Sequence, residues 1–184
     1  HLSIRRQRQM CIRDSLYTEA ADGTIIPGAA ESHSVSDDGL VYTFTIRDHN
    51  WSDGTPVTAH DFEFSFKRIL DPATAASYAY LMYTIAGGES FNSGEGSMDD
   101  VQVRAVDDKT LEVTLASPAP YFIAQTTHNT AYPVPKHVVE ALGDEWSRPE
   151  NIVVNGAFKV SEWTIGEKLT VTKNPGFYLS LIHI

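Results

Sequence analysis

The sequence is short of cysteine, of long apolar runs and of basic residues. The single cysteine, Cys11, excludes an internal disulfide framework. No run approaches the roughly 18 apolar residues that a membrane-spanning helix needs. The chain has 14 Lys and Arg against 24 Asp and Glu, for a formal net charge of −10. Because nucleic-acid binding depends on a basic surface, we expect no nucleic-acid partner.

The motifs of the common reaction classes are also missing. None of the seven histidines forms an i, i+4 pair, and a single cysteine cannot supply a Cys-x-x-Cys pair. Gly94 and Gly96 lack the third glycine of a nucleotide-binding loop, and there is no Gly-x-x-x-x-Gly-Lys run. His33 lies near Asp37 and two serines, but closeness in sequence does not make a catalytic triad. We therefore expect no metal site, no cofactor and no enzymatic activity.

The two ends differ in character from the rest of the chain. Residues 1–15 hold four of the 14 basic residues and the only cysteine, and residues 179–184 read LSLIHI. A basic tail on an acidic protein can bind a membrane or a partner. Both ends also resemble adapter-derived translation at the ends of assembled reading frames, and we favour this interpretation. We expect 1–15 and 179–184 to be non-native segments.

What the sequence does contain is a regular alternation of strand and helix patterns. Residues 40–47 alternate branched and aromatic side chains in the period of a β-strand. Thr58 can cap a helix over 58–70, with Asp61 three residues on and an apolar face of Ala59, Phe62, Phe66 and Ile69. The Asp71-Pro72 pair ends that helix. Both patterns are typical of a globular domain.

Further elements follow the first strand and helix. The sequence predicts a second helix over 75–85 and a polar, glycine-rich surface loop over 87–100. Hairpins are predicted over 101–116 and over 157–173, where 157–163 pairs with 168–173. Short helices are predicted within 118–126 and over 136–142. The fold class is therefore α/β or mixed α+β.

Between residues 17 and 178 the chain resembles a known family. Its sharpest motif runs from Trp51 through Asp53, Gly54, Pro56 and Thr58, followed by Asp61-Phe62. Other matching segments are Gly28 to Ser32, Ser77-Tyr78-Ala79 and Asn155-Gly156-Ala157-Phe158. In these segments the chain resembles the bacterial oligopeptide- and dipeptide-binding proteins of ABC importers, extracellular solute-binding protein family 5. We expect the motif residues to be structural rather than ligand-binding: Trp51, Asp53, Gly54, Pro56, Thr58, Asp61 and Phe62.

The resemblance implies a fold and a domain plan. Members of the family have a two-lobed periplasmic-binding-protein type II fold that closes over its ligand by a hinge. Residues 16–150 resemble the family's additional domain with a little of the first lobe. Residues 151–178 resemble the return into the first lobe, marked by Asn155 and Gly156. The second lobe is missing, so the chain is expected to be a fragment that does not bind ligand alone.

The resemblance also implies a ligand, partners and a location. Peptide-binding relatives hold an extended peptide as an added strand, and Tyr78 matches a tyrosine near the ligand's amino end. The alternative is that Tyr78 is a packed aromatic beside Tyr80 and Tyr83. Implied partners are a peptide ligand and membrane permease subunits. A monomer is expected, periplasmic or lipid-anchored on the outer face of the cytoplasmic membrane.

Several alternatives stay open from the sequence. Binders of nickel, haem or sugar oligomers share the same scaffold, so the resemblance indicates the family and leaves the ligand type open. A peptide sensor or surface protein without a transport role is another candidate. His33 departs from the family pattern, because relatives often carry tryptophan after the Ala-Glu-Ser run, and we expect looser local packing there.

Overall fold

The computed structural model describes residues 12–164 and 166–178, which fall into two compact units. Unit 2 consists of residues 15–47 and 58–133, and unit 1 of residues 12–14, 48–57 and 134–178 in the described part of the chain. The mixture of helices and strands confirms the predicted fold class. Of the ends predicted to be non-native, residues 1–11 and 179–184 lie outside the described residues. Within the described ranges, no helix has the length and apolar character that crossing a membrane requires.

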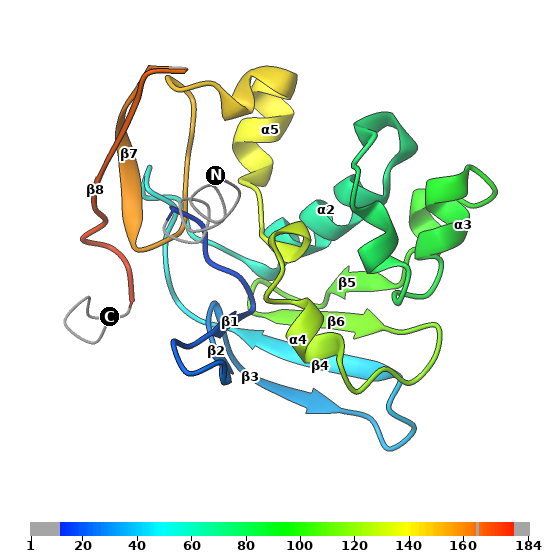
Figure 1. The fold of residues 1–184 in the computed structure, drawn as a ribbon. Helices are drawn as coiled ribbons and strands as arrows, with labels where there is room; N and C mark the ends of the chain where they lie inside the picture. The colour runs from blue at the N-terminus through cyan, green and yellow to red at the C-terminus, as the bar shows by residue number, and fades with distance from the viewer. Residues whose placement is uncertain (1–11, 165, 179–184) are drawn as a thin grey trace. The chain divides into compact units, whose positions relative to one another are not determined.

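A four-stranded antiparallel sheet forms the base of unit 2 (Figure 1). Its order is β3-β4-β6-β5, with β3 at Ala30–Val35, β4 at Val41–Ile46, β6 at Thr110–Thr114 and β5 at Val103–Ala105. The strand predicted over 40–47 and the hairpin predicted over 101–116 are both confirmed. Because β4 pairs with β6, the two predicted elements meet although about 65 residues separate them.

One face of this sheet is buried. Tyr42, Phe44 and Ile46 of β4 are at most 5% exposed, and Leu111 and Val113 lie opposite them on β6. Helix α2 (Ala59–Leu70) contacts β5 and β6, and α4 (Phe122–Gln125) packs its first residue edge-on against the ring of Tyr42, 5.1 Å between centroids. The strand alternation of period two thus supplies one apolar layer, and the helices supply the other.

The start and end of α2 follow the sequence signals. The N-cap Thr58 and the third helical residue, Asp61, form a capping box, in which the Thr58 backbone N–H donates to Asp61 Oδ2 at 2.9 Å. Asp71 ends the helix before Pro72. The predicted helix is confirmed, but Ile69 is only half-buried and Leu70 is fully buried in its place. The buried stripe is therefore rotated slightly from the predicted one.

The helix predicted over 75–85 is wrong. The structure has two single turns of 3-10 helix, η1 (Pro72–Thr74) and η2 (Ala79–Met82), with Ala75 between them at φ 48°. Beyond η2, Ile85 forms an isolated bridge with Leu115, where Ala116 N–H donates to Thr84 O and Ala86 N–H donates to Thr114 O. These tertiary bonds outweigh the local helical preference.

The predicted surface loop over 87–100 is also only partly correct. It contains helix α3 (Gly88–Ser93) and one turn, η3 (Met98–Asp100). Both residues flanking α3, Gly87 and Gly94, have positive φ. The side-chain amide of Asn92 donates to the carbonyl of Leu70 at 2.9 Å. Packing against the end of α2 therefore stabilises a helix that its glycine-rich sequence does not predict.

A small hairpin and an aromatic contact complete the N-terminal part of unit 2. Strands β1 (Tyr17–Glu19) and β2 (Ile25–Pro27) pair antiparallel. The ring of His33 on β3 lies 5.2 Å from that of Tyr17, and Tyr17 Oη and His33 Nδ1 are hydrogen-bonded at 2.6 Å. Burial lowers the pKa of His33 and raises the pKa of Tyr17. Tyr17 is buried and His33 is exposed, so this contact holds the His33 ring against the edge of the core.

Unit 1 contains the remaining elements. They are α5 (Lys136–Leu142), the turn η5 (Gly143–Ser147) and the antiparallel hairpin of β7 (Phe158–Thr164) with β8 (Lys168–Lys173). Both the short helix over 136–142 and the hairpin over 157–173 are confirmed. Trp51 and Trp146 are each less than 9% exposed and form the apolar centre of this unit with Val154.

Candidate functional site

A pair of exposed tyrosines stands out on unit 2. In a 3-10 helix of three residues per turn, Ala79 and Met82 share the inner face of η2, and both are buried. Tyr78 and Tyr80 lie on either side of Ala79 and are 54% and 56% exposed. The buried residues thus anchor the turn while the two phenol rings face solvent.

These rings form an aromatic cluster, defined here as Tyr78, Tyr80 and His128. The centroids of Tyr78 and Tyr80 are 6.1 Å apart with a tilt of 44°. The ring of His128 meets Tyr78 edge-on at 5.9 Å. His128 is the N-cap of the turn η4 (Asn129–Ala131), where its Nδ1 accepts the backbone N–H of Thr130 at 3.3 Å. Contacts on both sides therefore restrict the position of the Tyr78 ring.

The side chains of the aromatic cluster are suited to binding a ligand. Tyrosine rings offer flat apolar area, a negative π-face and a phenol group that can donate or accept a hydrogen bond. Within the part of the chain that the structure describes, no group of three or more His, Cys, Asp or Glu could hold a metal ion. Two adjacent, half-exposed rings are typical of a surface that contacts a ligand.

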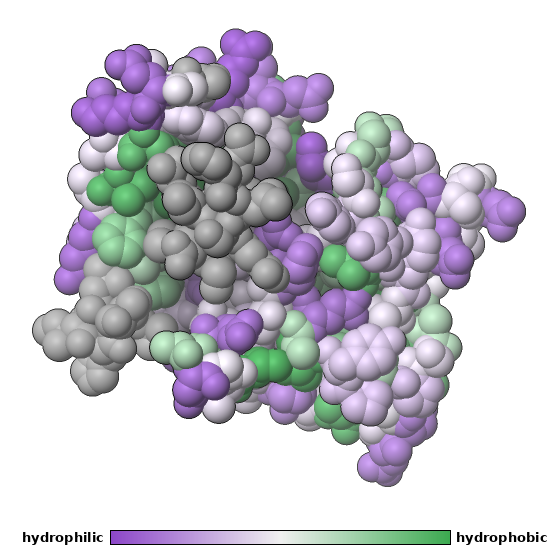
Figure 2. Space-filling model, viewed as in Figure 1, coloured by the Kyte–Doolittle hydropathy of each residue, from purple (hydrophilic) through white to green (hydrophobic). Residues whose placement is uncertain are grey.

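Surface hydropathy does not reveal this cluster. In Figure 2 the hydrophobic residues on the visible face form small, separate patches among hydrophilic ones. Tyrosine and histidine count as hydrophilic on that scale, so ring contacts and exposed fractions are the informative measures. Of the sequence signals, the resemblance selects only Tyr78. Tyr80 and His128 were not predicted, because neither carries a motif.

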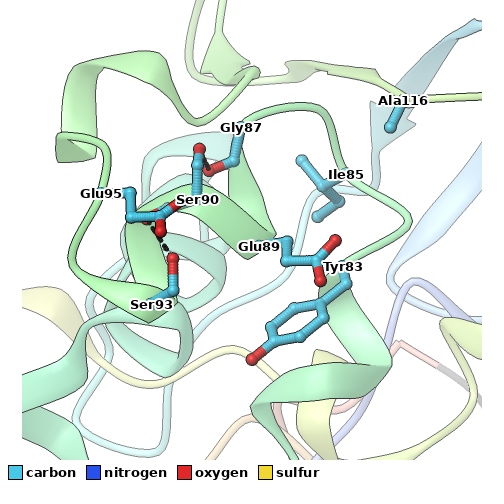
Figure 3. A pocket seen from close by; sticks show the side chains of 8 residues that line it. All are labelled: Tyr83, Ile85, Gly87, Glu89, Ser90, Ser93, Glu95 and Ala116. Atoms are coloured by element: carbon cyan, nitrogen blue, oxygen red, sulfur yellow. Dashed lines mark hydrogen bonds between the residues drawn. The ribbon is translucent and has the colours of Figure 1, made fainter.

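A hollow of unit 2 lies apart from the aromatic cluster (Figure 3). It has a volume of about 510 Å³ and is lined by residues of α3, of the segments on either side of it and of the segment after β6: Tyr83, Ile85, Gly87, Glu89, Ser90, Ser93, Glu95 and Ala116. The Ser90 hydroxyl donates to Gly87 O and the Ser93 hydroxyl to Ser90 O, both at 3.0 Å. Local backbone therefore occupies these hydroxyls. The other charged groups of the lining, Glu89 and Glu95, are exposed, as is typical of a solvated surface.

The motif residues, for which a structural role is predicted, make local contacts in the structure. Trp51 is 2% exposed, and Gly54 takes a φ of 94° in the turn that follows it. The Asp53 carboxylate accepts the Thr55 backbone N–H at 2.9 Å. Pro56 forms an isolated bridge with Asn50. On the other side of the motif, Thr58 and Asp61 cap α2, and Phe62 is fully buried against the sheet.

Asn155 and Gly156 hold two distant segments of unit 1 together. The side-chain oxygen of Asn155 accepts the Asp14 backbone N–H at 3.0 Å, and its amide group donates back to Asp14 O at 3.4 Å. Gly156 N–H donates to Ile12 O, and Asn174 donates to Gly156 O. Asn155 is 0% exposed. A buried residue with this many backbone partners fixes residues 12–14 against residues 155–156 within unit 1.

One ion pair in unit 1 was not predicted. His137 Nε2 and Asp53 Oδ2 are 2.7 Å apart, joining α5 to the motif turn across 84 residues of sequence. Burial acts to raise the pKa of Asp53, but hydrogen bonds from His137 and from Thr55 outweigh it and the pKa is lowered. No local pattern could have predicted this contact.

Replacing Asp53 with asparagine tests this pair, because an amide oxygen can still accept the Thr55 N–H. A carboxyl whose pKa is lowered by folding stabilises the protein above its unfolded value and loses that contribution as the pH falls. We expect Asp53→Asn to lower the free energy of unfolding by about 0.5–1 kcal/mol at about pH 5.5, small because the pair is partly solvent-screened. The difference should shrink as the pH falls below the unfolded carboxyl pKa of about 3.9.

Tryptophan fluorescence during urea unfolding measures this effect, since all three tryptophans lie in unit 1. The control is Asp144→Asn, the same change at an exposed position of η5, expected to stay within about 0.5 kcal/mol of the parent. An Asp53→Asn deficit that persists unchanged at about pH 3 would contradict the ion-pair account.

Comparison with known proteins places the chain among binding proteins. Residues 24–181 match the sequence model described as bacterial extracellular solute-binding proteins, family 5 middle. The periplasmic oligopeptide-binding protein OppA of Salmonella typhimurium is 44% identical over 168 residues, covering 90% of this chain and 31% of OppA. The probable deoxycholate-binding periplasmic protein YgiS of Escherichia coli is 42% identical, covering 85% of this chain and 30% of YgiS.

A solved structure gives the same result. The crystal structure of Haemophilus influenzae OppA in complex with RPPGFSPFR superposes with a TM-score of 0.90 at 38% identity. The match covers 94% of this chain and 34% of that one. The chain therefore spans about a third of the length of the proteins it is similar to.

Proposed function

The chain belongs to family 5 of the bacterial extracellular solute-binding proteins, and on this premise we propose that it is part of the peptide-capturing component of an ATP-driven importer. The observation that carries the proposal is the half-exposed Tyr78, held between Tyr80 and His128. Tyr78 contacts the peptide near its amino end, and the rest of the site comes from parts of the protein beyond this chain.

The wider biology follows from the same proposal. The protein acts outside the cytoplasmic membrane, in the periplasm or anchored by lipid, and delivers its ligand to membrane permease subunits. It is a monomer without enzymatic activity. Residues 16–150 form the additional domain with a little of the first lobe, and 151–178 return into the first lobe. Asn155 and Gly156 mark that return. The similarity to the periplasmic oligopeptide-binding protein OppA supports the location outside the cytoplasmic membrane and the peptide ligand.

Binding follows from a few physical steps. An extended peptide pairs its backbone with main-chain groups as an added strand, which gives affinity without reading its sequence. Hydrated pockets accept varied side chains through bridging water. Closure of two lobes by a hinge then excludes solvent. In this scheme the Tyr78 ring supplies apolar area at one end of the ligand.

A second ligand class has one observation in its favour. YgiS, whose name describes a probable deoxycholate binder, is nearly as similar to this chain as OppA is. The same scaffold therefore suits an apolar, non-peptide solute. Peptide remains the better proposal because OppA and its peptide complex match a larger share of the chain.

Calorimetric titration of the full-length protein with a mixture of tripeptides tests the proposal. We expect Tyr78→Ala to weaken peptide binding about 10-fold, since loss of an exposed aromatic anchor costs more than about 1 kcal/mol. The control is Tyr121→Ala, the same change at a tyrosine that is 62% exposed and precedes α4. It should bind within about 2-fold of the parent. Equal affinities of all three proteins would remove Tyr78 from the site.

A further inference from the structure

The negative charge of the protein is concentrated on the unit that carries the aromatic cluster. Residues 15–47 and 58–133 contain 15 acidic and 5 basic side chains, so unit 2 alone accounts for the whole net charge of −10. Lys67 is paired with Glu63 at 2.7 Å and Arg104 with Glu112 at 3.1 Å. The remaining excess of carboxylates gives unit 2 a field that attracts cations.

The ring pair is suited to hold a cation once it arrives. Both Tyr78 and Tyr80 are more than half exposed, and their centroids are 6.1 Å apart. The tilt of 44° leaves the rings out of a parallel stack. The face of a tyrosine ring is negative and attracts an ammonium or guanidinium group within about 6 Å of its centroid.

The third ring of the cluster is held by its own turn. His128 Nδ1 accepts the backbone N–H of Thr130 at 3.3 Å. Its edge-on contact with Tyr78 holds that ring in place. Ala79 and Met82, buried beneath the turn, do the same for the backbone between Tyr78 and Tyr80.

We propose that Tyr80 is a specificity-determining residue which, with Tyr78, favours peptides that present a lysine or arginine side chain to the ring pair. The inference rests on the proposed peptide-binding function and names the preferred class of ligand. The aliphatic stem of lysine or arginine covers the apolar ring surface, and its charged head adds the attraction of the π-face. An uncharged side chain of equal length gains only the first of these contacts.

The test compares peptides that differ only in charge. The full-length protein is titrated calorimetrically with Lys-Ala-Ala, Ala-Lys-Ala and Ala-Ala-Lys, and with the same three peptides carrying norleucine for lysine. We expect one lysine peptide to bind about 2- to 5-fold more tightly than its norleucine counterpart. Tyr80→Ser should bring this ratio close to one. Tyr80→Phe keeps the ring and should keep the ratio.

A matched control is Tyr121→Ser, the same substitution at another exposed tyrosine of unit 2, which should leave the ratio unchanged. A ratio near one for all three parent pairs, or a ratio that survives Tyr80→Ser, overturns the role of Tyr80 while peptide binding itself stands. Absence of heat with every peptide overturns the proposed function instead, so the two failures are distinguishable.

Discussion

Replacing Phe62 with alanine is expected to lower the free energy of unfolding by about 3–5 kcal/mol. Phe62 is 0% exposed on the face of α2 that packs on the sheet. Deleting its ring removes buried apolar area and leaves a cavity, which the close-packed neighbours fill only in part. Urea unfolding followed by far-UV circular dichroism measures the loss, because unit 2 contains no tryptophan.

Phe64→Ala is the matched control for this loss. It makes the same chemical change two residues further along α2, at a half-buried position. The expected cost is about 1 kcal/mol, because less apolar area is lost and water can fill the space. Equal losses for the two variants would mean that the buried face of α2 is assigned wrongly.

Gly87→Ala is expected to lower the free energy of unfolding by about 3 kcal/mol or more. Gly87 has a φ of 78°, and an added Cβ would lie 2.1 Å from the carbonyl oxygen of Asp100. A backbone oxygen cannot rotate away as a side chain can. The backbone strain of alanine at a positive φ and the steric clash with Asp100 therefore both contribute to the loss of stability. Residues 98–101 must shift to relieve the clash.

Gly94→Ala separates the two causes. Gly94 also has a positive φ, 83°, but nothing lies within 4 Å of an added Cβ. It should therefore cost only the strain of a left-handed alanine, about 1–2 kcal/mol. The same urea unfolding experiment applies. If Gly87→Ala is no more damaging than Gly94→Ala, the close approach of Gly87 to Asp100 is not a feature of the folded protein.

The elements that the sequence predicted well are those specified by neighbours in the chain. The spacing of Thr58 and Asp61 is enough to place the start of α2, since a capping box needs only residues three apart. Strand β4 and both confirmed hairpins have local alternation and short turns. Local signals of this kind carry over directly to the structure.

The errors come from contacts between distant residues. Residues 84–86 bond to residues 114–116, at the end of β6 and just after it. Only 79–82 then form the turn η2, where a helix over 75–85 was predicted. Helix α3 forms against the end of α2, where Asn92 bonds Leu70 O. The pair of His137 with Asp53 spans 84 residues. Periodicity and propensity carry no information on such contacts.

The candidate site divides in the same way. Tyr78 was predicted, but only through the family resemblance, because a tyrosine in an apolar segment reads equally well as core. Its exposed fraction of 54% is known only from the structure. The role of Tyr80 depends on a ring contact and on the charge of unit 2, and neither is visible until the chain is divided into units.

The division into units also bears on the family motif. Trp51, Asp53, Gly54 and Pro56 lie in unit 1, whereas Thr58, Asp61 and Phe62 lie in unit 2. The part in unit 1 forms a tight turn at Gly54, and the part in unit 2 caps the start of α2 and buries Phe62. That the motif contributes no group to a ligand stays a prediction.

Calorimetric titration of the full-length protein with tripeptides is the measurement that bears most directly on the central claim. It should be run beside matched titrations with nickel, haem and a sugar oligomer. The account predicts saturable binding of peptides that weakens about 10-fold in Tyr78→Ala, with no saturable binding of the other three ligands. Binding of nickel, haem or the sugar oligomer, with no heat from any peptide, would contradict it.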